Sequence, residues 1–112
     1  MSFFSSDIVQ EEMQEIAKLQ EQVFENMFTF FTMEKEEKIE HIELLEQLIS
    51  KQRVLYTRLS LSDDPEAKRM LQRILDSSVE MGYPKDIDLR QILQTMEKQL
   101  CSLKKMMESG VD

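Results

Sequence analysis

The sequence is poor in the residues from which catalytic and metal sites are usually built. It contains one cysteine, one histidine and no tryptophan. One cysteine and one histidine cannot form a disulfide framework or a cysteine-rich zinc site, and they give little basis for a Cys–His catalytic pair. Two glycines and two prolines are too few for the turns of a β-sandwich or for a glycine-rich phosphate loop. These absences predict a protein that is not an enzyme and that holds no cofactor and no metal ion.

Long hydrophobic runs are also missing. The longest uncharged stretch lies between Glu25 and Glu34, and it is less than half of the roughly 20 residues that a membrane helix needs. The first residues lack the basic and apolar blocks of a secretory signal, and the last residues carry no lipidation pattern. A single cysteine suits a reducing compartment. We therefore expect a cytoplasmic protein that does not associate with membranes.

The composition is typical of soluble helical proteins. Of the 112 residues, 41% are apolar and 32% are charged, and the formal net charge is −8. A chain of this length builds one hydrophobic core, so we expect residues 1–112 to form a single helical domain. The negative net charge disfavours nonspecific binding to nucleic acid.

Apolar residues recur at spacings of three, four and seven along most of the chain, which is the pattern of amphipathic helices. The sequence predicts an all-α fold, a small helical bundle in which a long antiparallel hairpin is followed by a shorter C-terminal helical pair. The expected helices begin after Ser5–Asp7, at Thr32, after Asp63 and at Asp88, and they end near Phe31, Leu59, Gly82 and Glu108.

The apolar faces of the first two helices are wider than one neighbouring helix requires. A monomer of this size would leave part of such faces exposed to water. We therefore predict a homo-oligomer, with a dimer favoured, built mainly on the first two helices.

All six phenylalanines lie within the first 31 residues. Those in the first helix fit a core or a homodimer seam better than a free docking surface, since buried apolar stripes are the rule in amphipathic helices. Phe3 and Phe4 precede the helix, where they either staple onto its first turn or form a docking handle. The four phenylalanines that follow them in the chain are Phe24, Phe28, Phe30 and Phe31.

Charge is distributed unevenly along the chain. Residues 1–50 carry twelve acidic and three basic side chains, whereas residues 51–112 carry ten acidic and eleven basic ones. A basic strip within residues 51–73 would suit a phosphate backbone or an acidic partner. The interpretation we favour is that these cations pair with the carboxylates of the chain itself or of a second copy. The strip consists of Lys51, Arg53, Arg58, Lys68, Arg69 and Arg73.

Two remaining features could suggest a metal site or a reactive thiol, but the neighbouring residues support neither. Glu37 and His41 are four residues apart, but a carboxylate-bridged metal site needs Glu-x-x-His, and the residue three before His41 is Lys38. Cys101 has no second cysteine or neighbouring histidine to activate it, so we expect a buried or half-buried thiol.

Three segments resemble a known family. The opening Phe3–Glu12, the run Glu36–His41 and the run Arg53–Ala67 are similar to small proteins of cyanobacteria and of the T-even-like myoviruses that infect them. That family is known only as a domain of unknown function. The resemblance implies a cyanobacterial or cyanophage origin, with the host cytoplasm or the virion as location, but it brings no activity. It also implies that Arg53, Tyr56, Arg58, Asp63 and Asp64 are more than incidental surface.

Together these features predict a non-enzymatic helical interaction protein that self-associates and acts as an accessory or assembly factor on a host or phage protein. The alternative is a nucleic-acid-associated protein that uses the basic strip. The candidate partner-binding residues are Phe3, Phe4, Arg53, Tyr56 and Arg58.

Overall fold

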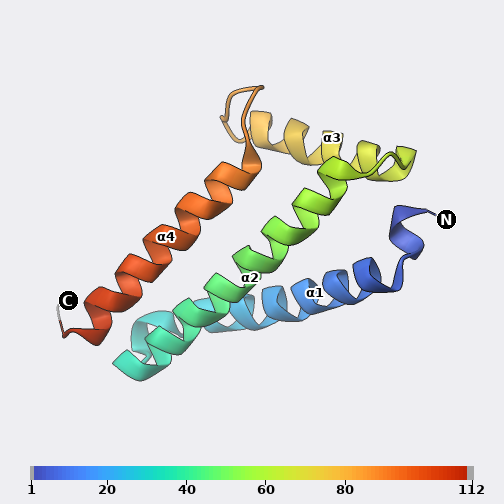
Figure 1. Cartoon of the computed structure of the whole chain (residues 1–112). Coiled ribbons are helices and arrows are strands. Elements are labelled where there is room, and N and C mark those ends of the chain that lie inside the picture. The colour runs from blue at the N-terminus through green and yellow to red at the C-terminus, as the bar shows by residue number, and fades with distance from the viewer. Residues whose placement is uncertain (1, 111–112) are drawn as a thin grey trace.

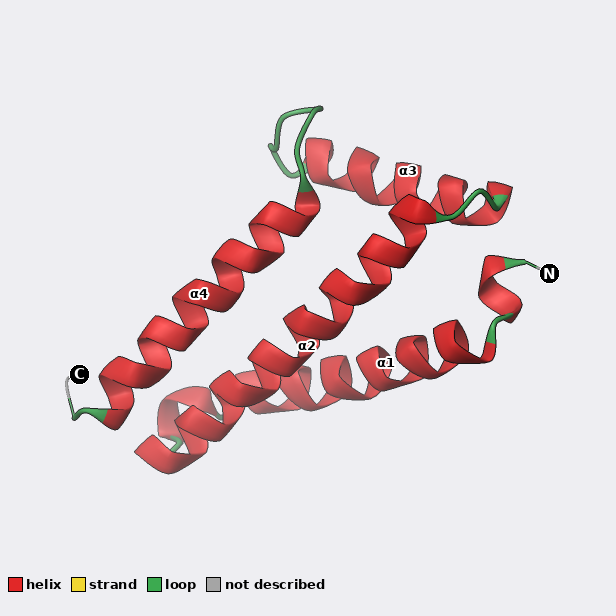
Figure 2. Ribbon diagram, in the orientation of Figure 1, coloured by secondary structure: helices red, strands yellow, loops and turns green. Residues whose placement is uncertain are grey.

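The computed structural model describes residues 2–110, and within that range it contains helices and loops but no strand (Figure 2). This confirms the predicted all-α fold. The α-helices are α1 (Asp7–Met27), α2 (Lys35–Leu61), α3 (Pro65–Glu80) and α4 (Leu89–Glu108), and two short 3-10 turns, η1 (Phe3–Ser5) and η2 (Phe30–Thr32), flank α1.

The central element is α2, against which each of the other α-helices packs (Figure 1). A short connection joins α1 to α2, and the two run antiparallel, as predicted. Figure 1 shows α4 running along the other side of α2, while α3 crosses the C-terminal end of α2. The turn η1 packs on both α1 and α3. The molecule is therefore an open layer of three long helices with one helix across its end.

This layer follows from the wide apolar surface of α2. Its residues Leu44, Leu48 and Leu55 pack with Ile16, Leu19 and Val23 of α1. Another face of α2 contributes Ile42 and Ile49, which are 2% and 5% exposed. Because α2 is apolar on more than one side, it accepts a neighbour on each side.

The start of α2 and the end of α1 differ from the prediction. The helix α1 stops at Met27 rather than near Phe31, and Glu34 rather than Thr32 is the N-cap of α2. The hydroxyl of Thr32 donates to the Thr29 carbonyl at 2.8 Å, within the turn η2. Threonine side chains that bond nearby carbonyls in this way compete with helix continuation.

The start of α3 shifts by one residue. Its N-cap is Asp64, not Asp63, because Pro65 takes the first helical position. The other boundaries agree with the prediction. Asp88 caps α4 by accepting the Arg90 N–H at 3.0 Å, and Gly82 follows α3 with φ of 104°, a conformation that favours glycine.

Candidate interaction surface

Phe3 and Phe4 are attached to the fold rather than free. Both are half-buried, and their rings stack edge to face with centroids 5.0 Å apart. The Phe3 N–H donates to the Asp64 carboxylate, which links the N-terminal turn to the start of α3. The same carboxylate accepts the Glu66 N–H at 3.0 Å. The bond from Phe3, followed by the bond from Glu66, lowers the pKa of Asp64.

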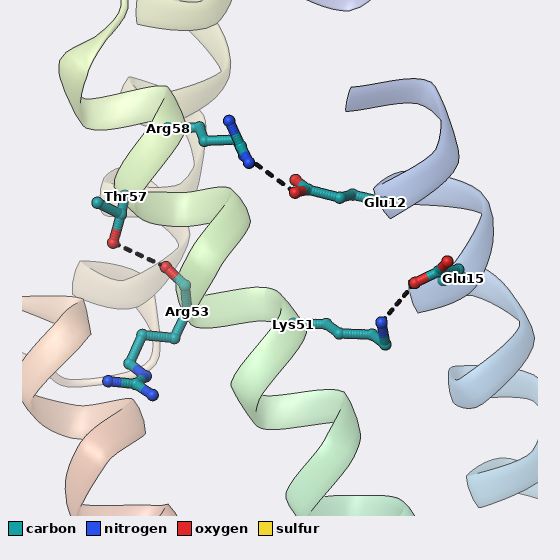
Figure 3. Close-up of polar contacts among 6 residues, drawn as sticks. All are labelled: Glu12, Glu15, Lys51, Arg53, Thr57 and Arg58. Carbon is teal, nitrogen blue, oxygen red and sulfur yellow. Dashed lines mark hydrogen bonds and ion pairs between the residues drawn. The ribbon is translucent and has the colours of Figure 1, made fainter. Parts of the chain in front are cut away.

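The basic residues of α2 face carboxylates on the neighbouring helices. Arg58 Nε lies 2.9 Å from Glu12 Oε1, and Lys51 pairs with Glu15, so both join α2 to α1 (Figure 3). Arg53 Nε lies 3.0 Å from Glu97 Oε1 on α4. Lys104 of α4 reaches back to Glu46 Oε1 at 3.0 Å. The favoured interpretation of the strip, pairing within the chain, thus holds for Lys51, Arg53 and Arg58.

Tyr56 lines an apolar cavity of about 380 Å³ near α3, on the side of α2 that lies between α1 and α4. A second apolar cavity, of about 320 Å³, lies near η2 between the same helices. We call these two cavities together the trough. On α2 the lining residues recur at helical spacing, so they form one broad helical face. Those residues are His41, Ile42, Leu45, Gln52, Leu55, Tyr56 and Leu59.

The α4 wall of the trough is incompletely covered. No residue of α4 is buried, although the helix is strongly amphipathic. The positions Leu89, Ile92, Met96, Gln99, Leu103 and Met106 are spaced alternately by three and four, which is the spacing of a helix–helix seam. Within that seam, Leu103 lines the trough and is 44% exposed, whereas Met96 lines a neighbouring cavity beside Tyr83 and is 41% exposed. Within residues 2–110 these two side chains are left partly uncovered.

The whole molecule is more open than a compact monomer. Its accessible surface is 8082 Å², against about 6,500 Å² expected for a folded chain of this mass. Its radius of gyration is 16.1 Å, against about 13 Å for a compact domain of similar length. The excess is roughly 1,600 Å² of surface that a closed bundle would bury.

An exposed aromatic cluster lies where α1 meets η2. Phe24, Phe28 and Phe31 are 61%, 77% and 91% exposed, and the rings of Phe24 and Phe28 stack edge to face at 5.2 Å. We expected these residues to lie in a core or in a homodimer seam. The core is wrong for these three within the chain, whereas a homodimer seam stays a prediction. The amphipathic period predicted the helix and its wide apolar face. It did not predict which part of that face α2 would cover.

His41 lies buried at the same end of the molecule. It is 5% exposed, and its ring packs against Phe30 with centroids 5.4 Å apart. The buried Nδ1 has no hydrogen-bond partner within the described residues. Burial of the ring disfavours the imidazolium and lowers the pKa of His41. The sequence suggested this residue only as a remote metal ligand. Among residues 2–110 no group of three or more His, Cys, Asp or Glu side chains is arranged to hold a metal ion.

The low pKa of His41 makes the fold sensitive to mild acid. Well above pH 6.5 the side chain is neutral in both the folded and the unfolded state. As the pH falls through 6.5, the unfolded chain binds a proton that the folded chain resists, so stability is lost until the folded pKa is passed. Urea unfolding at a series of pH values should show this loss, and His41→Leu should reduce the slope of stability against pH in the range just below 6.5. An unchanged slope in the variant would assign the acid sensitivity to other groups.

The other features of the molecule are less informative. Cys101 is half-buried, as expected, in a polar groove of about 800 Å³ on the opposite side of α2. None of the described helices is both long enough and apolar enough to cross a bilayer.

Comparison with known proteins gives a family and no activity. The profile of a family described as a domain of unknown function (DUF1825) matches residues 1–107. No curated protein and no solved structure matches the chain.

Proposed function

Because this chain belongs to the DUF1825 family, whose description states no activity, we propose from the surface of the molecule that it is a non-enzymatic, self-associating interaction protein. The observation that carries the proposal is the uncovered trough with its α4 seam. In the cell, we propose that it serves as an accessory or assembly factor in cyanobacteria or cyanophage-infected cells, as the resemblance of its sequence implies.

The occupant of the trough is a second copy of the chain. An obligate homodimer buries about 1,000 Å² or more from each partner, and the roughly 1,600 Å² of excess surface is enough for such an interface. A two-fold axis that places α1 of each copy beside α4 of the other also matches the charges. Helix α1 carries six acidic residues and one basic residue, whereas α4 carries four basic and two acidic ones. Pairing α1 with α1 would instead oppose like charges.

Size-exclusion chromatography with light scattering tests the proposal. We expect a particle of twice the 13.3 kDa chain mass at micromolar concentration. Met96→Asp combined with Leu103→Asp should give a monomer, because both side chains lie in the seam and carboxylates there would have to lose their water. Both positions are exposed, so the isolated chain should retain its helicity by circular dichroism.

A matched control uses exposed apolar residues outside the trough. Leu61 and Met81 are each 78% exposed, so Leu61→Asp with Met81→Asp should leave the dimer intact. A wild-type protein that elutes as a monomer would refute the proposal, and a dimer that survives the Met96 and Leu103 changes would place the interface elsewhere.

The alternative role in nucleic-acid binding has less support. Three of the six cations in the basic strip already face carboxylates of the same chain. Those pairs reduce the positive potential that a phosphate backbone would meet, and the net charge of −8 opposes it further.

A further inference from the structure

We propose that the exposed phenylalanines at the junction of α1 and η2 form a docking site for a basic amphipathic segment of a partner protein. The end patch comprises Phe24, Phe28 and Phe31. Phe31 also lines the trough with Leu103 of the α4 seam, whereas Phe24 and Phe28 do not line the trough. The inference builds on the proposed role as an interaction protein, but it does not depend on the dimer.

The end patch is comparable in size to the largest apolar patch that a soluble monomer usually exposes. Phe24, Phe28 and Phe31, exposed to 61%, 77% and 91%, together present on the order of 400 Å² of aromatic surface. The largest apolar patch of a monomer is often a functional one. Phe24 lies in the last turn of α1 and Phe28, the C-cap of that helix, follows one turn later, so they offer adjacent contacts to an extended or helical ligand.

Carboxylates lie at the same end of the molecule as the end patch, and their charge bears on which partner fits. Glu21 and Glu25 lie one helical turn from Phe24 and Phe28. The first turns of α2, at the same end of the molecule, add four more exposed carboxylates, with two lysines among them (Figure 1). None of the six carboxylates takes part in an ion pair within residues 2–110. The four on α2 and its N-cap are Glu34, Glu36, Glu37 and Glu40.

This charge selects a basic partner over the other candidates. A two-fold contact between two end patches would oppose acidic residues with acidic residues. An anionic membrane would be repelled for the same reason. A helix with an apolar face flanked by lysine or arginine matches both the phenylalanines and the carboxylates. Its apolar side chains would cover the rings, and its cations would face the carboxylates.

The test is a binding measurement with two designed probes. One is a fluorescently labelled helical peptide of leucine and lysine, about 18 residues long, and the other replaces each lysine with glutamate. We expect micromolar binding of the basic probe in low salt and at least a tenfold loss of affinity at about 0.5 M salt, where charges are screened. The acidic probe should not bind.

Two variants test whether the basic probe binds at the end patch. Phe24→Ser with Phe28→Ser should weaken binding of the basic probe by about tenfold or more, because aromatic anchors dominate such interfaces. The matched control, Leu61→Ser with Met81→Ser, removes two exposed apolar side chains elsewhere and should bind as the wild type does. Circular dichroism verifies that both variants fold.

Several results would overturn the inference. These are equal binding of both probes, no binding of the basic probe at about 500 µM, or unchanged binding by the Phe24 and Phe28 variant. Light scattering on the same samples separates this inference from the proposed dimer. A variant that dimerises normally but loses the probe supports the docking site, whereas loss of self-association in that variant would make a second copy the occupant of the end patch.

Discussion

Replacing Leu59 with alanine is expected to lower the free energy of unfolding by about 2–5 kcal/mol, the range for a fully buried leucine. Leu59 is 2% exposed near the end of α2. It lines the trough together with Met70 of α3 and Leu89 of α4, so its side chain sits where three helices meet. The neighbouring cavity is already open, and truncation would enlarge it rather than let the helices close over the gap.

Urea unfolding followed by circular dichroism measures this change, and Val54→Ala is its control. Val54 lies on the same helix and is 43% exposed, so its truncation removes a similar apolar group without making a buried cavity. We expect the control to change stability by less than about 1 kcal/mol. Equal effects at Leu59 and Val54 would show that the junction of α2, α3 and α4 is not a close-packed core.

Asp64→Ala is expected to release the N-terminal turn from α3. The Asp64 carboxylate accepts N–H groups from both Phe3 and Glu66, so its loss leaves the cap of α3 and the attachment of η1 without an acceptor. The melting temperature should fall by several degrees. Because the Phe3 N–H is hydrogen-bonded in the wild type, we expect it to exchange slowly there and rapidly in the variant.

The same contact gives Asp64 a defined pH dependence. Its folded pKa lies below 3.8, because both bonds favour the carboxylate. The stabilisation is therefore complete above pH 3.8 and is lost as the pH falls through the lower folded pKa. Asp64→Ala should remove this acid-sensitive contribution to stability. Asp63→Ala should retain it, since Asp63 is not the N-cap of α3. A Phe3 amide that stays protected in Asp64→Ala would contradict the attachment.

These residues also bear on Phe3 and Phe4 as candidate partner-binding residues. Their half-buried rings and the bond to Asp64 give them a structural role in joining η1 to α1 and α3. A role in partner binding remains a prediction for both, as it does for Arg53, Tyr56 and Arg58. The structure adds the end patch and the α4 seam, which offer larger exposed apolar surfaces than η1 does.

Local rules were enough to derive the helices from the sequence. The three- and four-residue spacing, the Asp88 cap and the Gly82 stop depend on residues close in the chain, so α3 and α4 have nearly the expected bounds. The pairing of Lys51, Arg53 and Arg58 with carboxylates also followed from the charge asymmetry alone. The charge asymmetry did not identify the carboxylate that pairs with each cation, because that depends on which helices lie side by side.

Tertiary structure decided which apolar residues are covered. Phe24 and Leu19 both belong to the wide apolar face of α1, yet Leu19 is 9% exposed and Phe24 61%. The difference arises because α2 occupies only part of that face, and the position of α2 depends on contacts far apart in the chain. The amphipathic period thus determined that α1 and α4 have apolar faces, whereas the open packing around α2 determined that the trough and the end patch are left uncovered.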